Sequence, residues 1–555
     1  MRIATTGRAL TPLAREEIFT PEFLAFLAAA KKAQGDTAAR ARWLERQTRG
    51  VELLVSREKL MAGLPNYATY FGRDMLVTAL MMRSIWRDQM SEFAIAAALR
   101  KLGPAGDVSH EEALGGQAVR EGARDYATLV GTALRAAREG RRAAADSLLA
   151  GARTVLGDLR RTRENYHMID DELQLAVLAG RWLGDSTVSA ERKRAFLLDS
   201  ADGRGTRAER LLRELALVSR MTGAYASDPA VQNLVSFAPR DSTHWSSASW
   251  RDSGAGYANG RWAMDVNAIW APHALEAMGQ VLQSMRRLRI STDSIARAHP
   301  DVMAGSPLEQ WSRDTLALRR ATDIWWGAER HFVVELDAAT VHERVAARIA
   351  AMSAAERDYW KALLERTGAD RDSLTFLALA LDGAGRPIGV ANSDVATRLF
   401  LGDGERGAEQ ADAGARALRD VRLFTRAYPV GLLIAGVGPV VANDAYASPS
   451  VWRDFERDSY HGPKVVWGRE VNLFLLGVAN RIAANDARPS DVPELRTAFQ
   501  QVLGAVEASG FHSELWSYEV RDGRVVPARY GIASDVQLWS TTDLAVQYMR
   551  ARIAR

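Results

Sequence analysis

The chain has 555 residues, 47% of them hydrophobic and 25% charged, which is the composition of a folded globular protein. Its 72 Lys and Arg nearly balance its 68 Asp and Glu, and the two signs alternate along the sequence. Because nucleic-acid binding needs clustered positive charge, we expect no nucleic-acid partner. The absence of cysteine excludes disulfides, thiolate nucleophiles and Cys-based zinc sites.

No segment approaches the ~20 consecutive apolar residues of a membrane span, so we expect no membrane partner. The first residues, MRIATTGRALTPLAREEIF, contain no apolar run long enough for a signal peptide. We therefore expect either a cytoplasmic protein, or a periplasmic or secreted one whose leader has been removed.

Helical periodicity dominates the chain. Residues 1–55 are predicted as a helical lead-in, since Gly and Pro begin to cluster only near Gly63. Apolar residues then recur at the spacing of buried helices within residues 74–86, 170–183, 265–282 and 471–482. Residues 336–372 are charged and helix-forming, which suggests an inserted helical hairpin. No linker divides residues 56–555, so we predict one large helical domain there.

Long loops separate the helices and carry many of the aromatic residues, in residues 63–73, 101–116, 236–262 and 443–470. Loops of this length are usually functional. A saccharide site needs aromatic faces for the C–H surface of the sugar and carboxylates near its hydroxyls. Several of the 15 Trp lie within a few residues of an acid, although a tryptophan packed in the core is the alternative for each.

Two acids stand out as a catalytic pair. Glycoside hydrolysis uses one carboxyl that protonates the leaving oxygen and a second that activates water or attacks carbon. Asp252 lies among Gly, Ser and Trp residues, and Glu514 lies beside His512 and Trp516. A turn aspartate and a surface glutamate are the plain alternatives.

Acids also stand where apolar helices begin, at Asp74, Asp170, Asp265 and Asp535. An acid in that position commonly caps the helix or balances its dipole, so each of them has a structural explanation that needs no catalysis.

With these motifs the chain resembles the six-hairpin glycosidases, specifically the debranching-enzyme glucosidase group (amylo-α-1,6-glucosidase) and glycoside hydrolase family 63. The matching segments occur in the same order, YFGRDMLVTALMM, WRDSGAG with MDVNAIW, SYHGPKVVWGREVNLFLLG, and GFHSELWSYE with IASDVQLWSTTDL. They extend from residue 67 to about 546. The chain departs from the pattern at Arg251, which separates Trp250 from Asp252, and at Gly468, where many relatives have proline.

The resemblance implies an all-α fold, an (α/α)6 toroid with aromatic-rich loops at one end. It implies an inverting hydrolase of α-glucans or α-glucosides, with no cofactor and no metal, acting on an oligosaccharide or polysaccharide. Asp252, kept protonated by dry aromatic surroundings, would be the general acid, and Glu514 the general base. The implied sugar-binding residues are Arg73, Asp74, His110, Glu111, Trp250, Tyr460, His461, Trp467 and Trp516.

Two other functional classes remain open. A helical polysaccharide lyase would use Tyr460 and His461 to abstract a proton from a uronic acid, and it would need a pocket rich in Lys and Arg. A non-catalytic glycan-binding protein would keep the aromatic residues, while its carboxyls would not face each other across a pocket. A terpene-cyclase-like barrel is disfavoured, because DDELQ at Asp170 lacks the third acid of the usual magnesium motif.

Overall fold

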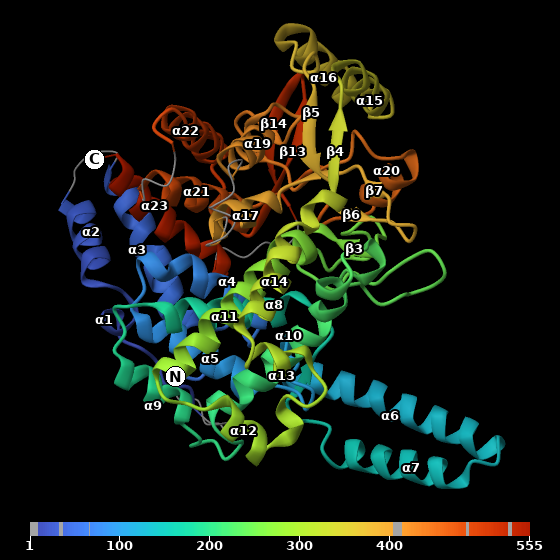
Figure 1. The fold of residues 1–555 in the computed structure, drawn as a ribbon. Helices are drawn as coiled ribbons and strands as arrows, with labels where there is room; N and C mark the ends of the chain where they lie inside the picture. The colour runs from blue at the N-terminus through green and yellow to red at the C-terminus, as the bar shows by residue number, and fades with distance from the viewer. Residues whose placement is uncertain are drawn as a thin grey trace.

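The computed structural model describes residues 9–32, 37–65, 67–402, 404, 413–483, 488–530 and 536–554. The prediction of a predominantly helical chain is confirmed, and the strands in the described ranges are short (Figure 1). The apolar segments predicted from the sequence coincide with the most deeply buried helices, because a helix that is apolar on every side is stable only when protein surrounds it.

The centre of the molecule is built from helices that are buried along most of their length. They are α4 (Gly72–Met81), which continues into the turn η1 (Met82–Ser84), α8 (Asp170–Gly184), the π-helical turn η3 (Asp265–Trp270) with α11 (Ala271–Arg287), α17 (Val395–Leu401), α21 (Gly468–Ala483), and η6 (Trp539–Thr542) with α23 (Asp543–Ile553). Neighbours in this series contact each other: α4 packs on α8, α8 on α11, η3 on α17, α17 on α21 and α21 on α23, while η6 contacts α4.

Amphipathic helices cover this centre, and each packs on one or two of the central helices. They are α3 (Thr37–Leu54), α5 (Asp88–Arg100), α10 (Arg207–Ser227), α14 (Thr315–Trp326), α19 (Ala413–Thr425) and α22 (Val492–Ser509). Helix α3 contacts α23, so the predicted lead-in packs against the last helix of the chain. Shorter helices complete the surface: α1 (Arg15–Ile18), α2 (Pro21–Lys32), α9 (Ala190–Leu198), α12 (Thr292–Ala298), α13 (Pro307–Trp311) and α20 (Pro449–Glu456).

Two helical hairpins extend from the body (Figure 1). In the predicted insertion, α15 (Ala338–Ala350) and α16 (Ala354–Thr367) lie between the paired strands β4 (Val333–Leu336) and β5 (Leu374–Leu377). The second hairpin, α6 (Gly115–Arg138) and α7 (Arg142–Gly157), lies between the paired strands β1 (Glu111–Ala113) and β2 (Arg163–Asn165). Its sequence is rich in helix-forming residues, but nothing in it predicts that the hairpin stands away from the body.

Small antiparallel sheets lie in the loops, and the helical periodicity did not predict them. The longest joins β12 (Val465–Trp467), β13 (Leu515–Arg521) and β14 (Arg524–Arg529). In a second three-stranded sheet, β6 (Ala380–Leu381) pairs with β3 (Trp262–Ala263) on one side and with β7 (Pro387–Ile388) on the other. Two further pairs join β8 (Ala391–Asn392) to β11 (Ala442–Asn443), and β9 (Leu433–Ile434) to β10 (Gly438–Pro439). Strands of two to seven residues are too short to show a clear alternating pattern. Over the described ranges, no helix is both long and apolar enough to cross a membrane.

The central helices approach closely at glycines, which gives a stability prediction. A Cβ at Gly180 of α8 would stand 2.7 Å from the Cβ of Ala277 in α11, whereas a Cβ at Gly504 of α22 would meet nothing within 4 Å. We expect Gly180→Ala to lower the free energy of unfolding by about 1–3 kcal/mol through overpacking. Gly504→Ala should raise it by up to ~1 kcal/mol, because alanine favours helix. Melting temperatures of the two variants test this; a similar shift for both would contradict the close packing.

Candidate functional site

Buried acids stand at the N-terminal ends of the central helices. They are Asp74 of α4, Asp170 and Asp171 of α8, Asp265 of η3, Asp394 before α17, Glu470 of α21 and Asp543 of α23. Side chains link these ends directly: Ser393 donates to Glu470 (3.0 Å), and Asn472 donates to Thr542 (2.9 Å). Carboxylates are stabilised at helix N-termini, and here they gather at one end of the helical centre.

Arg73 joins two of these ends to the loop that contains Asp252. It is buried, and its Nε lies 2.6 Å from Asp170 Oδ2, while its Nη1 lies 3.2 Å from Asp252 Oδ2. The predicted sugar-binding arginine is therefore already engaged with two carboxylates. Arg73 fixes the direction of Asp252 from the start of α4.

Arg251, the residue that interrupts the family pattern, points away from Asp252 into the protein. Its guanidinium is fully buried and lies 2.9 Å from Asp394 Oδ1, and it also donates to the Val441 carbonyl (2.8 Å). Buried arginine of this kind requires such partners, because an unpaired charge in the interior is very costly. The pair attaches the Asp252 loop to the start of α17.

The side chain of Asp252 is more exposed to solvent than the sequence predicted. Its side chain is 42% exposed, and Arg73 lies beside it. The expectation of dry aromatic surroundings is wrong for this structure, since the neighbouring tryptophan, Trp250, is directed into the core.

Glu514 lies immediately before β13 and is mostly buried. Its backbone carbonyl accepts a hydrogen bond from Gly468 N (2.9 Å), and its Oε2 accepts one from Gln537 Nε2 (2.5 Å). Burial raises the pKa of Glu514, the Gln537 hydrogen bond opposes that rise, and the charge of Asp252 adds to it. The two predicted catalytic carboxyls therefore lie close enough for one charge to act on the other.

Asp74 and Tyr67 belong to the same neighbourhood. Burial raises the pKa of Asp74 to about 7, with Arg73 opposing the rise and Glu514 adding to it. The pKa of Tyr67 is raised by burial and then by charges that include Glu514, Asp74 and Asp252. Tyr67 is 38% exposed, so a partly open aromatic ring stands among these carboxyls.

The histidine and glutamate predicted beside the pocket lie where β1 begins. His110 Nδ1 lies 2.8 Å from Asp171 Oδ2; burial alone would lower the pKa of His110, but the charge of Asp171 outweighs it and raises the pKa. Glu111 accepts a hydrogen bond from Asn165 (2.9 Å), and burial raises its pKa. Both side chains therefore have protein partners.

A second predicted cluster packs against the Asp252 loop. The ring of His461 stacks on Trp467 with centroids 5.6 Å apart, and its Nδ1 lies 2.8 Å from the Oγ of Ser253. Ser253 also donates to Asp458 (2.5 Å). His461 and Trp467 are buried, whereas Tyr460 is 47% exposed. The cluster holds Ser253, the residue that follows Asp252, in position. Tyr460 is the aromatic residue of the cluster that remains exposed.

Trp250 and Trp516 are not available as stacking surfaces for a sugar, and neither is Trp467, which is 5% exposed; this corrects the sequence prediction. Trp250 is 2% exposed, donates to Asp394 (3.0 Å), and has the guanidiniums of Arg251 and Arg469 over its ring at 4.4 and 4.5 Å. Trp516 is 1% exposed and donates to the Val437 carbonyl (2.9 Å). Both indoles serve the core, the ordinary place for tryptophan.

Sequence reasoning missed Tyr67 and Gln537 as individual site residues. Tyr67 lies in one of the aromatic loops, but nothing separates it there from Tyr70, which is fully buried. Gln537 lies in the C-terminal segment used for the resemblance, and the preceding residues 531–535 lie outside the described ranges. Only the fold brings Gln537 to Glu514.

A cavity of about 390 Å³ lies beside the Asp252 loop. Ser253, Gly254 and Tyr460 line it together with Asp454 and Arg457. A larger cavity of about 1290 Å³ lies elsewhere, lined by Gly180 and Arg181 of α8, by residues 399–402 and by Gly477 of α21. These positions are distant along α8 and α21 from the acidic helix starts.

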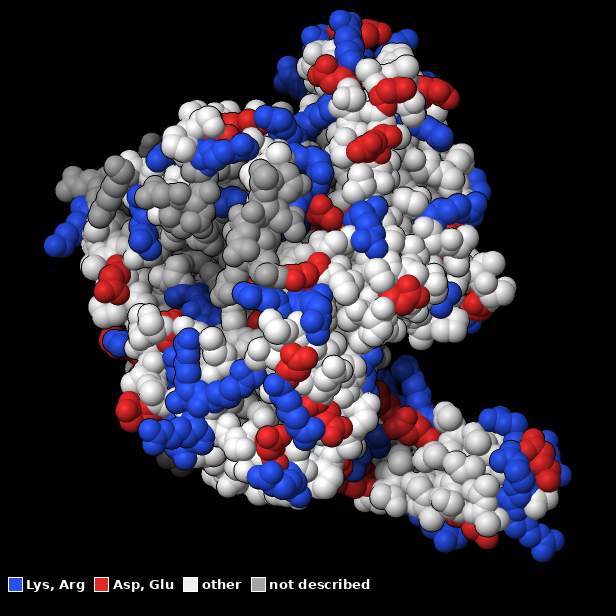
Figure 2. Space-filling model, viewed as in Figure 1, with Lys and Arg blue, Asp and Glu red and all other residues white. Residues whose placement is uncertain are grey.

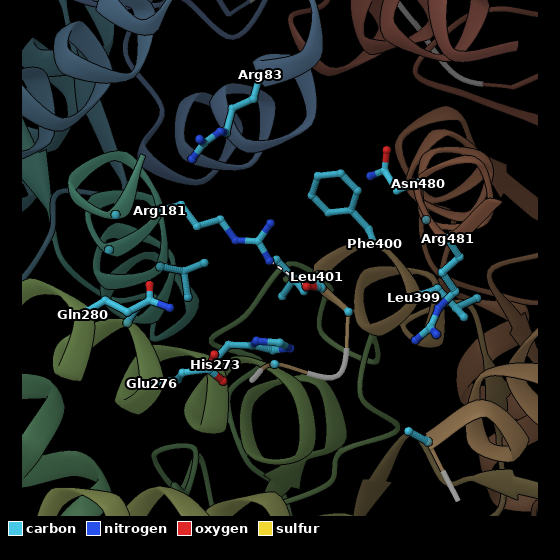
Figure 3. Close-up of a pocket in the computed structure, with 18 of the residues that line it drawn as sticks. Arg83, Arg181, His273, Glu276, Gln280, Leu399, Phe400, Leu401, Asn480 and Arg481 are labelled. Atoms are coloured by element: carbon cyan, nitrogen blue, oxygen red, sulfur yellow. Dashed lines mark hydrogen bonds between the residues drawn. The ribbon is translucent and has the colours of Figure 1, made fainter. Parts of the chain in front are cut away.

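The larger cavity contains none of the predicted site residues (Figure 3). Arg181 donates to the Leu401 carbonyl (2.6 Å), and burial lowers the pKa of His273 to about 3. Tyr460 lines the smaller cavity together with Ser253, the residue after Asp252, whereas Asp252 and Glu514 line neither of these two cavities. We place the candidate site at the Asp252–Glu514 pair, with the smaller cavity beside the loop that contains Asp252. Among the described residues, no group of three or more His, Asp or Glu is arranged to hold a metal ion.

No protein-family model matches the chain, and no curated protein sequence matches it either.

The raised pKa of Asp74 gives a pH prediction. Between pH 4 and 7 the folded protein retains a proton on Asp74 that the unfolded chain has released, so this carboxyl lowers stability as pH rises through that window. Asp74→Asn should therefore gain stability relative to the parent protein, by up to ~1.4 kcal/mol per pH unit across the window. Thermal unfolding at pH 5 and pH 8 measures the difference.

Asp337→Asn is the matched control. Hydrogen bonds from Thr340 lower the pKa of this exposed carboxyl, so its titration lies below the tested range and its effect should not change between pH 5 and 8. If the stability difference between Asp74→Asn and the parent protein is also the same at pH 5 and pH 8, Asp74 is already ionised at pH 5.

Proposed function

We propose that the chain is an inverting glycoside hydrolase that acts on an α-glucan or α-glucoside with Asp252 and Glu514 as its carboxyl pair. The observation that carries the proposal is that Asp252, held by Arg73 at the start of α4, and Glu514, held by Gln537 just before η6, stand near the helix starts that gather the buried acids, although 262 positions separate them in sequence. The charge of Asp252 is also one of the contributions that raise the pKa of Glu514. Tyr67 and Tyr460, both partly exposed, supply aromatic surface beside them.

The proposed architecture is a six-hairpin (α/α)6 toroid. Buried and covering helices alternate along the chain in the order α3, α4, α5, α8, α10, α11, α14, α17, α19, α21, α22 and α23. The contact of η6 with α4 joins the last buried segment to the first. This alternation and this closing contact support a ring of six helix pairs, with the candidate site at the N-terminal ends of the inner helices.

In the proposed reaction, one carboxyl donates a proton to the glycosidic oxygen while the other takes a proton from water on the opposite face of the sugar. We assign the acid to Asp252 and the base to Glu514, following the family resemblance. A bound sugar would cover the exposed side chain of Asp252 and exclude solvent from it. Arg73 would hold Asp252 in place, and Gln537 would hold Glu514.

The opposite assignment also has support in the structure. Glu514 is the buried carboxyl with a raised pKa, which suits a general acid, whereas Asp252 is solvated and lies beside Arg73. The identity of the acid is therefore the first matter for experiment. Both assignments use the same carboxyl pair and belong to the same reaction class.

A lyase reaction is less well supported by the same residues. Abstraction of a proton from a uronic acid by His461 would need an accessible ring nitrogen, but His461 is 1% exposed and stacked on Trp467. Arg73, Arg251 and Arg469, which would have to neutralise an anionic sugar, are buried and already contact Asp252, Asp394 and Glu470. A neutral sugar fits these surroundings better.

Asp252→Asn should reduce hydrolysis of α-linked glucose disaccharides by at least ~10³-fold, because an amide cannot donate the proton. The same variant should keep substantial activity on α-glucosyl fluoride, whose leaving group needs no proton, while Glu514→Gln should lose activity on both. Product chromatography and fluoride release measure these activities, with Asp337→Asn as the unaffected control. The reverse pattern would make Glu514 the acid, and full activity in both variants would contradict the proposed site.

Gln537→Met should move the acidic limb of the kcat/KM profile to higher pH. Removing the hydrogen bond from Gln537 removes an interaction that lowers the pKa of Glu514, so a base at this position would ionise only at higher pH. The exposed Gln310→Met serves as control. A shift of the basic limb instead would indicate that Glu514 acts as the acid, and unchanged limbs would exclude Glu514 from both roles.

A further inference from the structure

The α6–α7 hairpin presents an apolar face that no described part of the chain covers. Helix α7 packs on α6, and α6 packs on β1, while the rest of the hairpin stands away from the body (Figure 1). Its fully buried residues are small, and larger side chains such as Leu129, Leu148 and Val155 are half-buried beside them. The fully buried residues are Ala118, Gly122, Ala133, Ala136, Ala145 and Ala152. Other large apolar side chains are exposed, with Leu134 at 56%, Leu156 at 54%, Leu149 at 39% and Tyr126 at 37% exposure.

These exposed side chains lie on one side of the hairpin. At 100° per residue, Tyr126, Val130 and Leu134 follow the edge of α6 next to its buried face, and Leu149 and Leu156 follow the corresponding edge of α7. Because the two helices are antiparallel, both edges face the same way. Figure 2 shows an uncharged stretch along the middle of the projecting hairpin, with charged side chains at its tip and margins.

The spacing of this face matches another helix. On α6 the residues Ala123, Ala127, Val130, Leu134 and Ala137 are separated alternately by four and three positions, and Leu149 and Leu156 of α7 are seven apart. This is the heptad repeat of a coiled-coil seam. The alanines allow the backbone of a third helix to approach closely, whereas a lipid-binding face usually carries larger aromatic residues.

The charged residues of the hairpin indicate the sign of the charge that a binding partner would carry. Residues 115–157 contain seven Arg and no Lys against four Asp and Glu. Arg120 and Arg138 border the apolar arc of α6, and Arg142 and Arg153 border that of α7; none of these four makes an ion pair with a described residue. A second copy would bring like charges together, while an acidic helix would place its carboxylates opposite these arginines.

We propose that the α6–α7 hairpin is a docking site for an acidic amphipathic helix of a partner protein, which completes a three-helix bundle with the exposed leucines at its seam. The base of the hairpin is at β1, directly after His110, so the docking face lies on an arm that projects from beside the candidate site. This docking does not depend on the proposed hydrolase activity.

A designed probe tests the surface in the full-length protein. The probe is a fluorescent 21-residue helix peptide of three heptads, with Leu at positions a and d and Glu at positions e and g, and the control peptide carries Lys at e and g. Fluorescence anisotropy should show binding of the acidic peptide and at least tenfold weaker binding of the basic one. Equal binding of both peptides, or no binding of either, would overturn the proposal.

Two variants of the exposed residues complete the test. Leu134→Ser/Leu149→Ser/Leu156→Ser should weaken binding of the acidic peptide at least tenfold, and Arg142→Glu/Arg153→Glu should weaken it while strengthening the basic one. An unchanged melting temperature and far-ultraviolet circular dichroism spectrum establish that each variant is folded. Unaltered peptide binding in the leucine variant would contradict the docking face.

Two further measurements address other occupants. Sedimentation velocity of the parent protein should show no concentration-dependent dimer, and flotation with phosphatidylglycerol-containing vesicles should leave the protein unbound. A dimer that the leucine variant abolishes would assign the face to a second copy instead. Vesicle binding that the same variant abolishes would assign it to an anionic lipid surface, and either result would overturn the helix proposal.

Discussion

The structure depends on arginines that are buried against carboxylates where the central helices begin. Arg73 contacts Asp170, and Arg251 contacts Asp394 in a pair with no solvent exposure. Removing one partner of such a pair typically costs 3–5 kcal/mol, since the other charge is left uncompensated. The pairs therefore hold the helix starts and the intervening loops in one arrangement. The candidate site is a consequence of that arrangement.

The same contacts give the two carboxyls of the site different surroundings. Because Arg251 points into the protein, the next residue, Asp252, points outward to solvent and to Arg73. Glu514 is held from the other side by Gln537 and is largely buried. Burial raises the pKa of Glu514, whereas the side chain of Asp252 is 42% exposed, so the two carboxyls differ in their surroundings.

The two protruding hairpins differ in what they leave exposed. The α15–α16 hairpin is continuous with the β4–β5 pair, and its larger apolar residues, such as Trp360 and Val345, are buried. In the α6–α7 hairpin the fully buried residues are instead alanine and glycine, while Leu134, Leu149 and Leu156 are exposed. Burying small residues and exposing large ones is unfavourable for an isolated hairpin, which is the physical reason to expect a partner on that face.

The sequence by itself determined the helical class and the position of the buried helices, because a periodicity of 3.6 residues is a local property that the chain carries wherever it folds. It also singled out Asp252 and Glu514, through their unusual loops and the family resemblance. The tertiary structure decided which aromatic rings are open: Trp250 and Trp516 became core residues, while Tyr67 and Tyr460 remained exposed. It also decided that Gln537 meets Glu514 and that Arg73 meets Asp252. Burial and pairing of this kind depend on contacts between segments hundreds of residues apart, which no local pattern encodes.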